Sequence, residues 1–192
     1  MAETEAAQGE GQGQFDQRRQ LARLIEQYPG LHLRELARQA DISEALAGYH
    51  MDALQSAGLV EIQEDGVYKR FYPAKGPSPT ETEKDLIKIL RQRVPLQIVL
   101  NLLEGKQMPH TELTARLGLA KSTVSYHLAK LRDAGIIAAG EGTLFLAEPK
   151  RIERLLIKWE PPRDLTDSFA DLWEGFFLKK RRPGPEATQA SR

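Results

Sequence analysis

Apolar residues at helical spacing mark the first ordered part of the chain. Leu21, Leu24, Ile25 and Tyr28 follow one another at intervals of three, one and three residues and would share one helix face. Pro29 and Gly30 come directly afterwards and are typical of a helix end. The pattern therefore predicts an amphipathic helix over residues 15–27.

A longer segment of this pattern occurs twice, at an offset of 77 positions, since Tyr49 corresponds to Tyr126 (126 − 49 = 77). Each copy predicts a short helix (33–39 and 111–117), a tight turn and a longer helix (43–57 and 121–134), followed by a glycine and an apolar extended run. This order is that of a helix-turn-helix unit, which presents its second helix to a DNA groove.

Each copy also predicts a β-hairpin after its longer helix. Residues 59–63 and 67–72 flank the turn Glu64-Asp65-Gly66, and residues 136–146 flank Glu141-Gly142. Such hairpins are the wings of winged-helix domains. Prolines make 73–80 a stiff linker, so we expect one winged domain at 15–72 and a second at 81–148, which opens with helices over 81–92 and 95–104.

The two ends of the chain differ from these domains. Residues 1–14 hold no large apolar residue and, like 183–192, are expected to be disordered. Residues 149–182 predict C-terminal helices, and the last of them carries one apolar stripe. The stripe consists of Leu165, Phe169, Leu172, Trp173, Phe176 and Phe177. It would either cover its own domain or pair with a second copy, and we favour a homodimer.

The second copy resembles a known family at its longer helix. Residues 118–128, Gly-Leu-Ala-Lys-Ser-Thr-Val-Ser-Tyr-His-Leu, are similar to the recognition helix of ArsR-like winged-helix regulators. Residues 32–37 resemble the first motif helix of archaeal members that join two such domains. The resemblance covers about residues 15–177. It implies a mainly α fold with small β wings, built as two tandem winged helix-turn-helix domains, and it implies transcriptional regulation through double-stranded DNA.

Helix geometry selects the residues of the second copy that would meet DNA. Val124, Leu128 and Leu131 must face the core, so the opposite face of the helix points outward. Short hydroxyls let a helix approach base edges, while lysines neutralise phosphates. The predicted DNA-binding residues of this copy are Lys121, Ser122, Thr123, Ser125, Tyr126 and Lys130.

The first copy has a less suitable face. Glu44 replaces Lys121, Leu46 replaces Thr123, and Asp52 lies on the same outward side, where carboxylates would repel phosphates. Tyr49 remains a candidate DNA contact on this helix. Lys69 and Arg70 are candidates on the wing, which would touch the backbone of DNA while the helix does not read bases.

Charge and composition limit the other functions. The formal net charge is zero, but residues 81–160 hold 13 Lys and Arg against 10 Asp and Glu, whereas 15–75 hold 8 against 9. There is no cysteine, signal peptide or long apolar run, so we expect a cytoplasmic, nucleoid-associated protein without membrane contact.

The sequence indicates neither a metal site nor a catalytic site. Four histidines without cysteine or ligand spacing are a poor metal site, and His32 and His110 are interpreted as local structure at helix starts. No motif of a phosphate loop or a catalytic nucleophile occurs. We therefore expect no cofactor, no metal and no enzymatic activity.

Two other functions stay open. The neutral charge and the acidic first copy favour a tandem winged-helix scaffold that binds proteins of the transcription or chromosome machinery. A protein that coats DNA without sequence preference would carry more basic residues than this chain does. Lys121, Ser122, Thr123 and Tyr126 favour a sequence-selective regulator.

Overall fold

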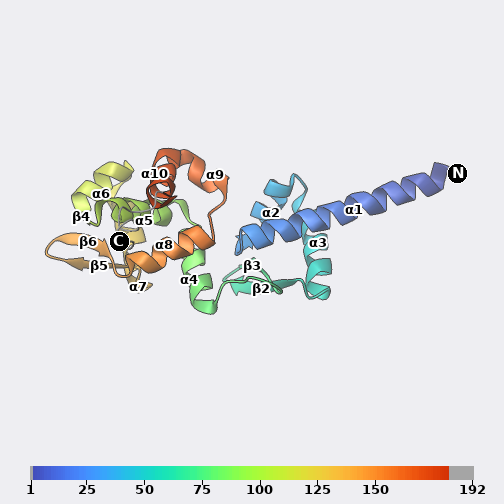
Figure 1. Ribbon diagram of the computed structural model, residues 1–192, viewed down its shortest axis with the longest axis horizontal. Helices are drawn as coiled ribbons and strands as arrows, with labels where there is room; N and C mark the ends of the chain where they lie inside the picture. The colour runs from blue at the N-terminus through green and yellow to red at the C-terminus, as the bar shows by residue number, and fades with distance from the viewer. Residues whose placement is uncertain (1, 182–192) are drawn as a thin grey trace, which may run out of the picture. The chain divides into compact units, whose positions relative to one another are not determined.

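The computed structural model describes residues 2–181, with the side chains of residues 13–178. The chain divides into two compact units, residues 1–87 and 88–192 (Figure 1). Each unit contains a helix-turn-helix and a three-stranded antiparallel sheet. The expected fold class, mainly helical with small β wings and two tandem winged helix-turn-helix domains, is confirmed.

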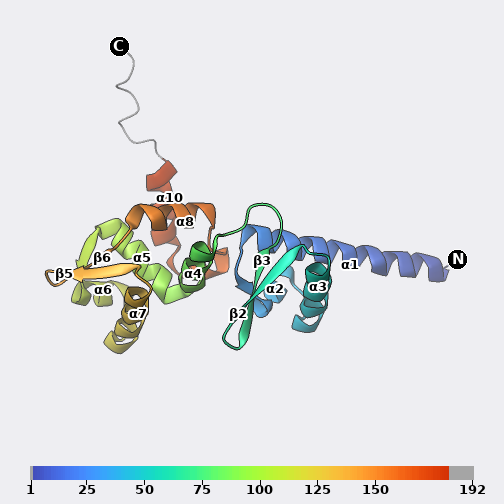
Figure 2. The same ribbon diagram turned by 90° about the horizontal axis from the view of Figure 1, so that it is seen from below.

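The first unit begins with α1 (Ala2–Gln27) and β1 (Leu31–His32). The helix-turn-helix follows as α2 (Leu33–Ala40) and α3 (Glu44–Ser56), and the wing as β2 (Val60–Asp65) and β3 (Tyr68–Pro73). The sheet order is β1-β3-β2, and Figure 2 shows the two long wing strands side by side. The core of the first unit consists of residues from α1, α2, α3 and the sheet. Leu21, Leu36, Met51 and Phe71 are all at most 3% exposed.

Local chemistry fixes the turn between α2 and α3. Asp41 takes the left-handed conformation at the end of α2, with φ of 55°, and its short polar side chain tolerates that region. Ser43 then caps α3, because its hydroxyl oxygen accepts a hydrogen bond from the Leu46 amide at 3.2 Å. The turn therefore sets the direction in which α3 leaves the core.

The second unit repeats this plan. After α4 (Glu81–Leu90), which the unit boundary crosses, come α5 (Arg93–Gly105), β4 (Gln107–Pro109), α6 (His110–Leu117) and α7 (Lys121–Asp133). The wing consists of β5 (Ile137–Gly140) and β6 (Thr143–Leu146), with the sheet order β4-β6-β5. The chain continues through α8 (Pro149–Lys158), α9 (Arg163–Thr166), a 3-10 turn (Asp167–Phe169) and α10 (Ala170–Arg181).

The structure differs from the expected tail at the N-terminus, because α1 starts at Ala2 and includes residues 2–14. Alanine, glutamate and glutamine are strong helix formers, so a segment with no apolar face can continue a helix whose later turns are packed. The other predicted tail, 183–192, lies outside the described residues.

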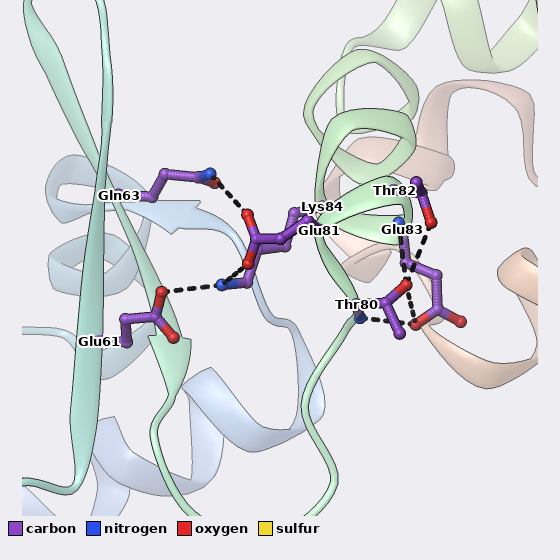
Figure 3. A network of polar contacts seen from close by, with 7 residues as sticks. All are labelled: Glu61, Gln63, Thr80, Glu81, Thr82, Glu83 and Lys84. Carbon is purple, nitrogen blue, oxygen red and sulfur yellow. Dashed lines mark hydrogen bonds and ion pairs between the residues drawn. The ribbon is translucent and has the colours of Figure 1, made fainter.

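The boundary between the units also differs from the expected linker at 73–80. It falls between Ile87 and Lys88, inside α4, so the first half of α4 belongs to the first unit. Lys84, 2% exposed, explains this assignment: its Nζ lies 2.9 Å from a carboxylate oxygen of Glu61 on β2 and 2.9 Å from one of Glu81 (Figure 3). The Lys84 ammonium also lies 4.8 Å from the ring centroid of Tyr72 on β3.

Burial and these carboxylates act in opposite directions on Lys84. Burial lowers the pKa of its ammonium, whereas the hydrogen bonds to Glu61 and Glu81 raise it, and the net pKa is raised. Lys84 therefore stays charged. Thr80 caps the same helix through a reciprocal pair with Glu83, in which the Thr80 amide donates to the Glu83 carboxylate at 2.9 Å (Figure 3).

The predicted last helix is divided into α9, a 3-10 turn and α10. Of its apolar stripe, Phe169 and Phe176 are buried at 8% and 9% exposure, and α10 packs on α5. Leu165, Leu172, Trp173 and Phe177 are only half-buried. The stripe thus partly covers its own unit.

Candidate nucleic-acid interface

The direction of α7 is set by residues that face the core. Gly118 ends α6 in the left-handed conformation, with φ of 63°, which a glycine adopts without strain. Val124, Leu128 and Leu131 of α7 are at most 2% exposed, as their spacing predicted. The first turns of the opposite helix face are therefore presented to solvent.

The predicted reading residues cluster on this exposed face. Lys121, Ser122 and Ser125 are exposed, Thr123 is half-buried, and Tyr126 is 66% exposed. Small hydroxyl side chains around one large aromatic ring leave the helix backbone accessible to a groove. The structure brings five of the six predicted residues of the second unit to one surface.

Lys130, the sixth, has a different position. It is half-buried, and its Nζ donates a hydrogen bond to Oε1 of Gln92 at 3.0 Å. Gln92 precedes α5 in the same unit. The Lys130 ammonium thus has a partner inside the protein, which helical projection alone does not reveal, and it is less available to a phosphate than Lys121.

Of the two histidines of the longer helices, His50 belongs to the core of its unit and His127 is half-buried. His50 is fully buried; its Nδ1 accepts a hydrogen bond from Nε of Arg18 at 3.3 Å, and its Nε2 donates to Oε1 of Gln17 at 3.1 Å. Burial, and then the charge of Arg18, lower the pKa of His50. Burial, and then Lys130, likewise lower the pKa of His127.

The corresponding face of α3 is occupied by partners from its own unit. Arg18 of α1 donates to the hydroxyl oxygen of Tyr49 at 3.4 Å and lies 5.6 Å from the centroid of its ring. Arg34 of α2 forms an ion pair with Glu44 at 3.0 Å. Within the part of the chain that the structure describes, no such contact holds Lys121 or the hydroxyl of Tyr126.

The wing of the first unit also differs from the expectation. Lys69 is exposed, but Arg70 is only 5% exposed and donates to Asp65 at 2.7 Å and to the Gly30 carbonyl at 2.8 Å. Alternation along β3 places Arg70 against β1 and the turn before it, so its guanidinium is bonded within the sheet and is not exposed on the wing. The exposed wing residues are Val67, at 91%, and Tyr68, at 64%.

One residue of the interface was missed by the sequence. His110, the first residue of α6, reaches Ser125 of α7 through a contact of 3.2 Å between its Nε2 and the serine Oγ. The position of His110 at a helix start indicated only local structure, since its spacing to the other histidines does not fit a metal site. The repeat contains a signal for this contact. At the offset of 77, His110 corresponds to Leu33 and Ser125 to Gly48, so only the second copy has polar side chains at these two positions.

The described residues form neither a metal-binding cluster nor a membrane-spanning helix. No group of three or more His, Cys, Asp or Glu side chains among them is placed to hold a metal ion. No helix in the same part of the chain combines the length and the apolar character needed to cross a membrane.

Comparisons with known proteins agree with this geometry. Residues 96–139 match the family model described as bacterial regulatory protein, arsR family, and residues 15–86 match a model described as an N-terminal HTH domain. The chain therefore carries two helix-turn-helix domains in tandem, and the second is similar to the arsR family over these residues. The match over residues 15–86 ends within α4, close to the boundary between the units.

One relative also matches across much of the chain. It is an uncharacterized HTH-type transcriptional regulator of Methanocaldococcus jannaschii, 30% identical over 128 residues, which are 66% of this chain and 31% of the relative. The chain thus spans about a third of that relative's length. The resemblance to ArsR-like tandem regulators is confirmed.

Proposed function

We propose that this protein is a sequence-selective DNA-binding transcriptional regulator of the cytoplasm, which reads the major groove with α7. The observation that supports it best is the exposed surface of Lys121, Ser122, Ser125 and Tyr126 at the start of a helix-turn-helix second helix. In this proposal, the hydroxyls and Tyr126 contact base edges or phosphates. Lys121 neutralises a phosphate.

The first unit has another part in this proposal. Glu44 and Asp52 are exposed on α3, and Tyr49 is held by Arg18, so α3 lacks a cationic edge for phosphates. Lys69 on the wing is its candidate DNA contact, and Arg70 no longer is. The second unit therefore supplies most of the affinity.

A fluorescence anisotropy titration of the full chain tests this division. The DNA would be a duplex from the upstream region of the protein's own gene, compared with a random duplex at two salt concentrations. Lys121→Glu should weaken binding by about 1 to 3 kcal/mol, which is roughly fivefold to 150-fold. Glu44→Ala, the matched variant in the first unit, should leave affinity unchanged or raise it. Wild-type affinity in a folded Lys121→Glu variant would refute the use of α7.

We further propose that two copies pair through α10. Trp173 and Phe177 stay half-buried after α10 packs on α5, and Trp173, Phe176 and Phe177 form a ring cluster with centroids 4.7 to 5.7 Å apart. Leu178 is 65% exposed beside them. Apolar surface of this kind is typical of an interface, and a two-fold dimer would present two α7 helices to paired half-sites.

Light scattering of the full chain tests the dimer. Phe169 and Phe176 belong to the core of the second unit, so removal of the whole helix would also disturb folding. Trp173→Asp combined with Leu178→Asp changes only half-buried and exposed positions and should give a folded monomer with weaker DNA binding. Glu174→Gln, an exposed change on the same helix, should stay dimeric. A wild-type protein that is monomeric at tens of micromolar would exclude the dimer.

The alternative, a protein-binding scaffold, is favoured by one observation. The wing of the first unit exposes Val67 and Tyr68, and its exposed Lys69 stands opposite Glu64, whereas a DNA-contacting wing would carry unopposed cations. A scaffold would show little affinity for any duplex at low salt, so the same titration separates the two functions.

A further inference from the structure

The contact between His110 and Ser125 joins the two helices of the second helix-turn-helix on its DNA-facing side. His110 is half-buried at the start of α6, and Ser125 is exposed on α7. Nε2 of His110 lies 3.2 Å from Oγ of Ser125, and Nδ1 lies 3.4 Å from Oγ1 of Thr114, one turn further along α6. Ser125, His110 and Thr114 thus form a chain of three polar groups.

The protons of this chain are determined by Thr114. Its hydroxyl donates to the backbone carbonyl of His110 at 2.8 Å, the ordinary bond of a threonine one turn into a helix. With its proton used there, Oγ1 of Thr114 acts toward the ring only as an acceptor, so Nδ1 of His110 carries the hydrogen. In a neutral ring Nε2 is then an acceptor. Ser125 must therefore donate its hydroxyl proton to His110.

In the first unit the two corresponding residues are also neighbours, but neither has a polar side chain. At an offset of 77, His110 corresponds to Leu33, Ser125 to Gly48 and Thr114 to Ala37. A Cβ on Gly48 would lie 3.8 Å from Cδ2 of Leu33, so these positions of α2 and α3 are also neighbours. The fold brings the two positions together in both units, but only the unit that carries Lys121 places a histidine and a serine there.

We propose that His110 is a positioning residue that turns Ser125 into an acceptor toward DNA, which rests on the proposed use of α7. Because the serine proton is held by His110, only lone pairs of Oγ face outward. In the major groove such an oxygen matches the exocyclic amino groups, adenine N6 or cytosine N4. Thymine O4 and guanine O6 offer no proton to it. His110 thereby contributes to base selection without touching a base.

The proton arrangement can be measured without DNA. At about pH 8 a histidine ring is ordinarily neutral, and nitrogen chemical shifts of the ring would then identify its tautomer. We expect the Nδ1–H form for His110, and the Nε2–H form for His50 as an internal reference, since Arg18 donates to Nδ1 of that ring. A predominant Nε2–H form of His110 would overturn the proposal.

The effect on base selection requires a panel of duplexes that differ at one operator position at a time. Wild type should prefer adenine or cytosine at one position by about threefold to tenfold, the range of one net hydrogen bond. His110→Leu, which copies the first unit, frees the serine proton and should remove this preference. His110→Gln, which can accept through its amide oxygen, should restore it. His110→Leu with Ser125→Gly should behave as His110→Leu alone, because the two residues act together.

Two results separate this proposal from the proposed function. If Lys121→Glu weakens binding while His110→Leu keeps the wild-type base preference, His110 has no positioning role and α7 still reads DNA. If Lys121→Glu binds as wild type, the proposed function itself fails. Loss of the preference in both His110→Leu and His110→Gln, with the fold intact, would show a merely structural role and overturn the inference.

Discussion

Ala47, Met51 and Leu54 of α3 occupy the positions that Val124, Leu128 and Leu131 occupy on α7, and all six are at most 5% exposed. The exposed positions do not correspond in this way. Lys121 and Thr123 in the second unit stand against Glu44 and Leu46 in the first. The buried face alone is therefore enough to maintain a helix-turn-helix. The charge of the exposed face is a separate property, which differs between the two units.

The two matched tyrosines give the largest expected difference between the units. Tyr126→Ala should weaken DNA binding by about 1 to 3 kcal/mol, because an exposed ring on the proposed reading face is lost. Tyr49→Ala should change affinity by less than about 0.5 kcal/mol, because Arg18 already holds Tyr49 against its own unit. Anisotropy titrations with one duplex would measure both. Equal losses would mean that the two units bind DNA alike.

The ion pairs of Lys84 with Glu61 and Glu81 give the next largest expected difference between the units. Lys84→Ala should destabilise the first unit by about 1 to 3 kcal/mol, because a buried side chain and two hydrogen bonds to carboxylates are lost. Amide hydrogen exchange should therefore speed up in β2 and β3 and stay unchanged in β5 and β6. Lys75→Ala, at an exposed position outside the helices, is the control. Equal acceleration in both wings would contradict the assignment of α4 to the first unit.

Acid should destabilise both units in the same direction. The pKa values of His50 and His127 are lowered from 6.5 in the folded chain, so between that value and the folded pKa the unfolded state binds more protons. Stability is complete above about pH 6.5, falls as the pH decreases below it, and levels off below the folded pKa. Chemical denaturation across this range would measure the loss. His50→Gln should reduce the pH dependence of the first unit only, and an unchanged dependence would show that His50 does not cause it.

The smallest expected effect concerns salt. Each phosphate contact adds about −0.9 to the slope of log affinity against log salt. Lys121→Gln should reduce the slope by about 0.9 for each bound copy. Lys130→Gln should reduce it less, because Lys130 is bonded to Gln92. A larger change for Lys130 than for Lys121 would reverse their proposed roles.

The helices and wings were predictable because their apolar positions repeat at regular spacing, and α2, α3, α6 and α7 lie within a few residues of the expected ranges. Strands β1 and β4, with two and three residues, are too short for a period to show, and they form through pairing with β3 and β6.

Side-chain partners were the least predictable part of the interface. Helical projection placed Lys121 and Tyr126 correctly on an exposed face, but Lys130 on this helix and Arg70 on the wing were both expected to be free cations. Their partners, Gln92 and the Gly30 carbonyl, are 38 and 40 positions away along the chain. Such contacts depend on tertiary packing, which periodicity within one helix does not describe.

The position of the unit boundary inside α4 has a consequence for modularity. A recombination event or a protease cut in the proline-rich segment before Thr80 would separate the wing from Lys84, and the downstream fragment would carry Leu86 and Ile87, which are buried in the intact chain. The repeated segment visible in the sequence is therefore not the exchangeable part. A domain swap with a relative should place its junction after Ile87, within the helix, and keep the helical register across it.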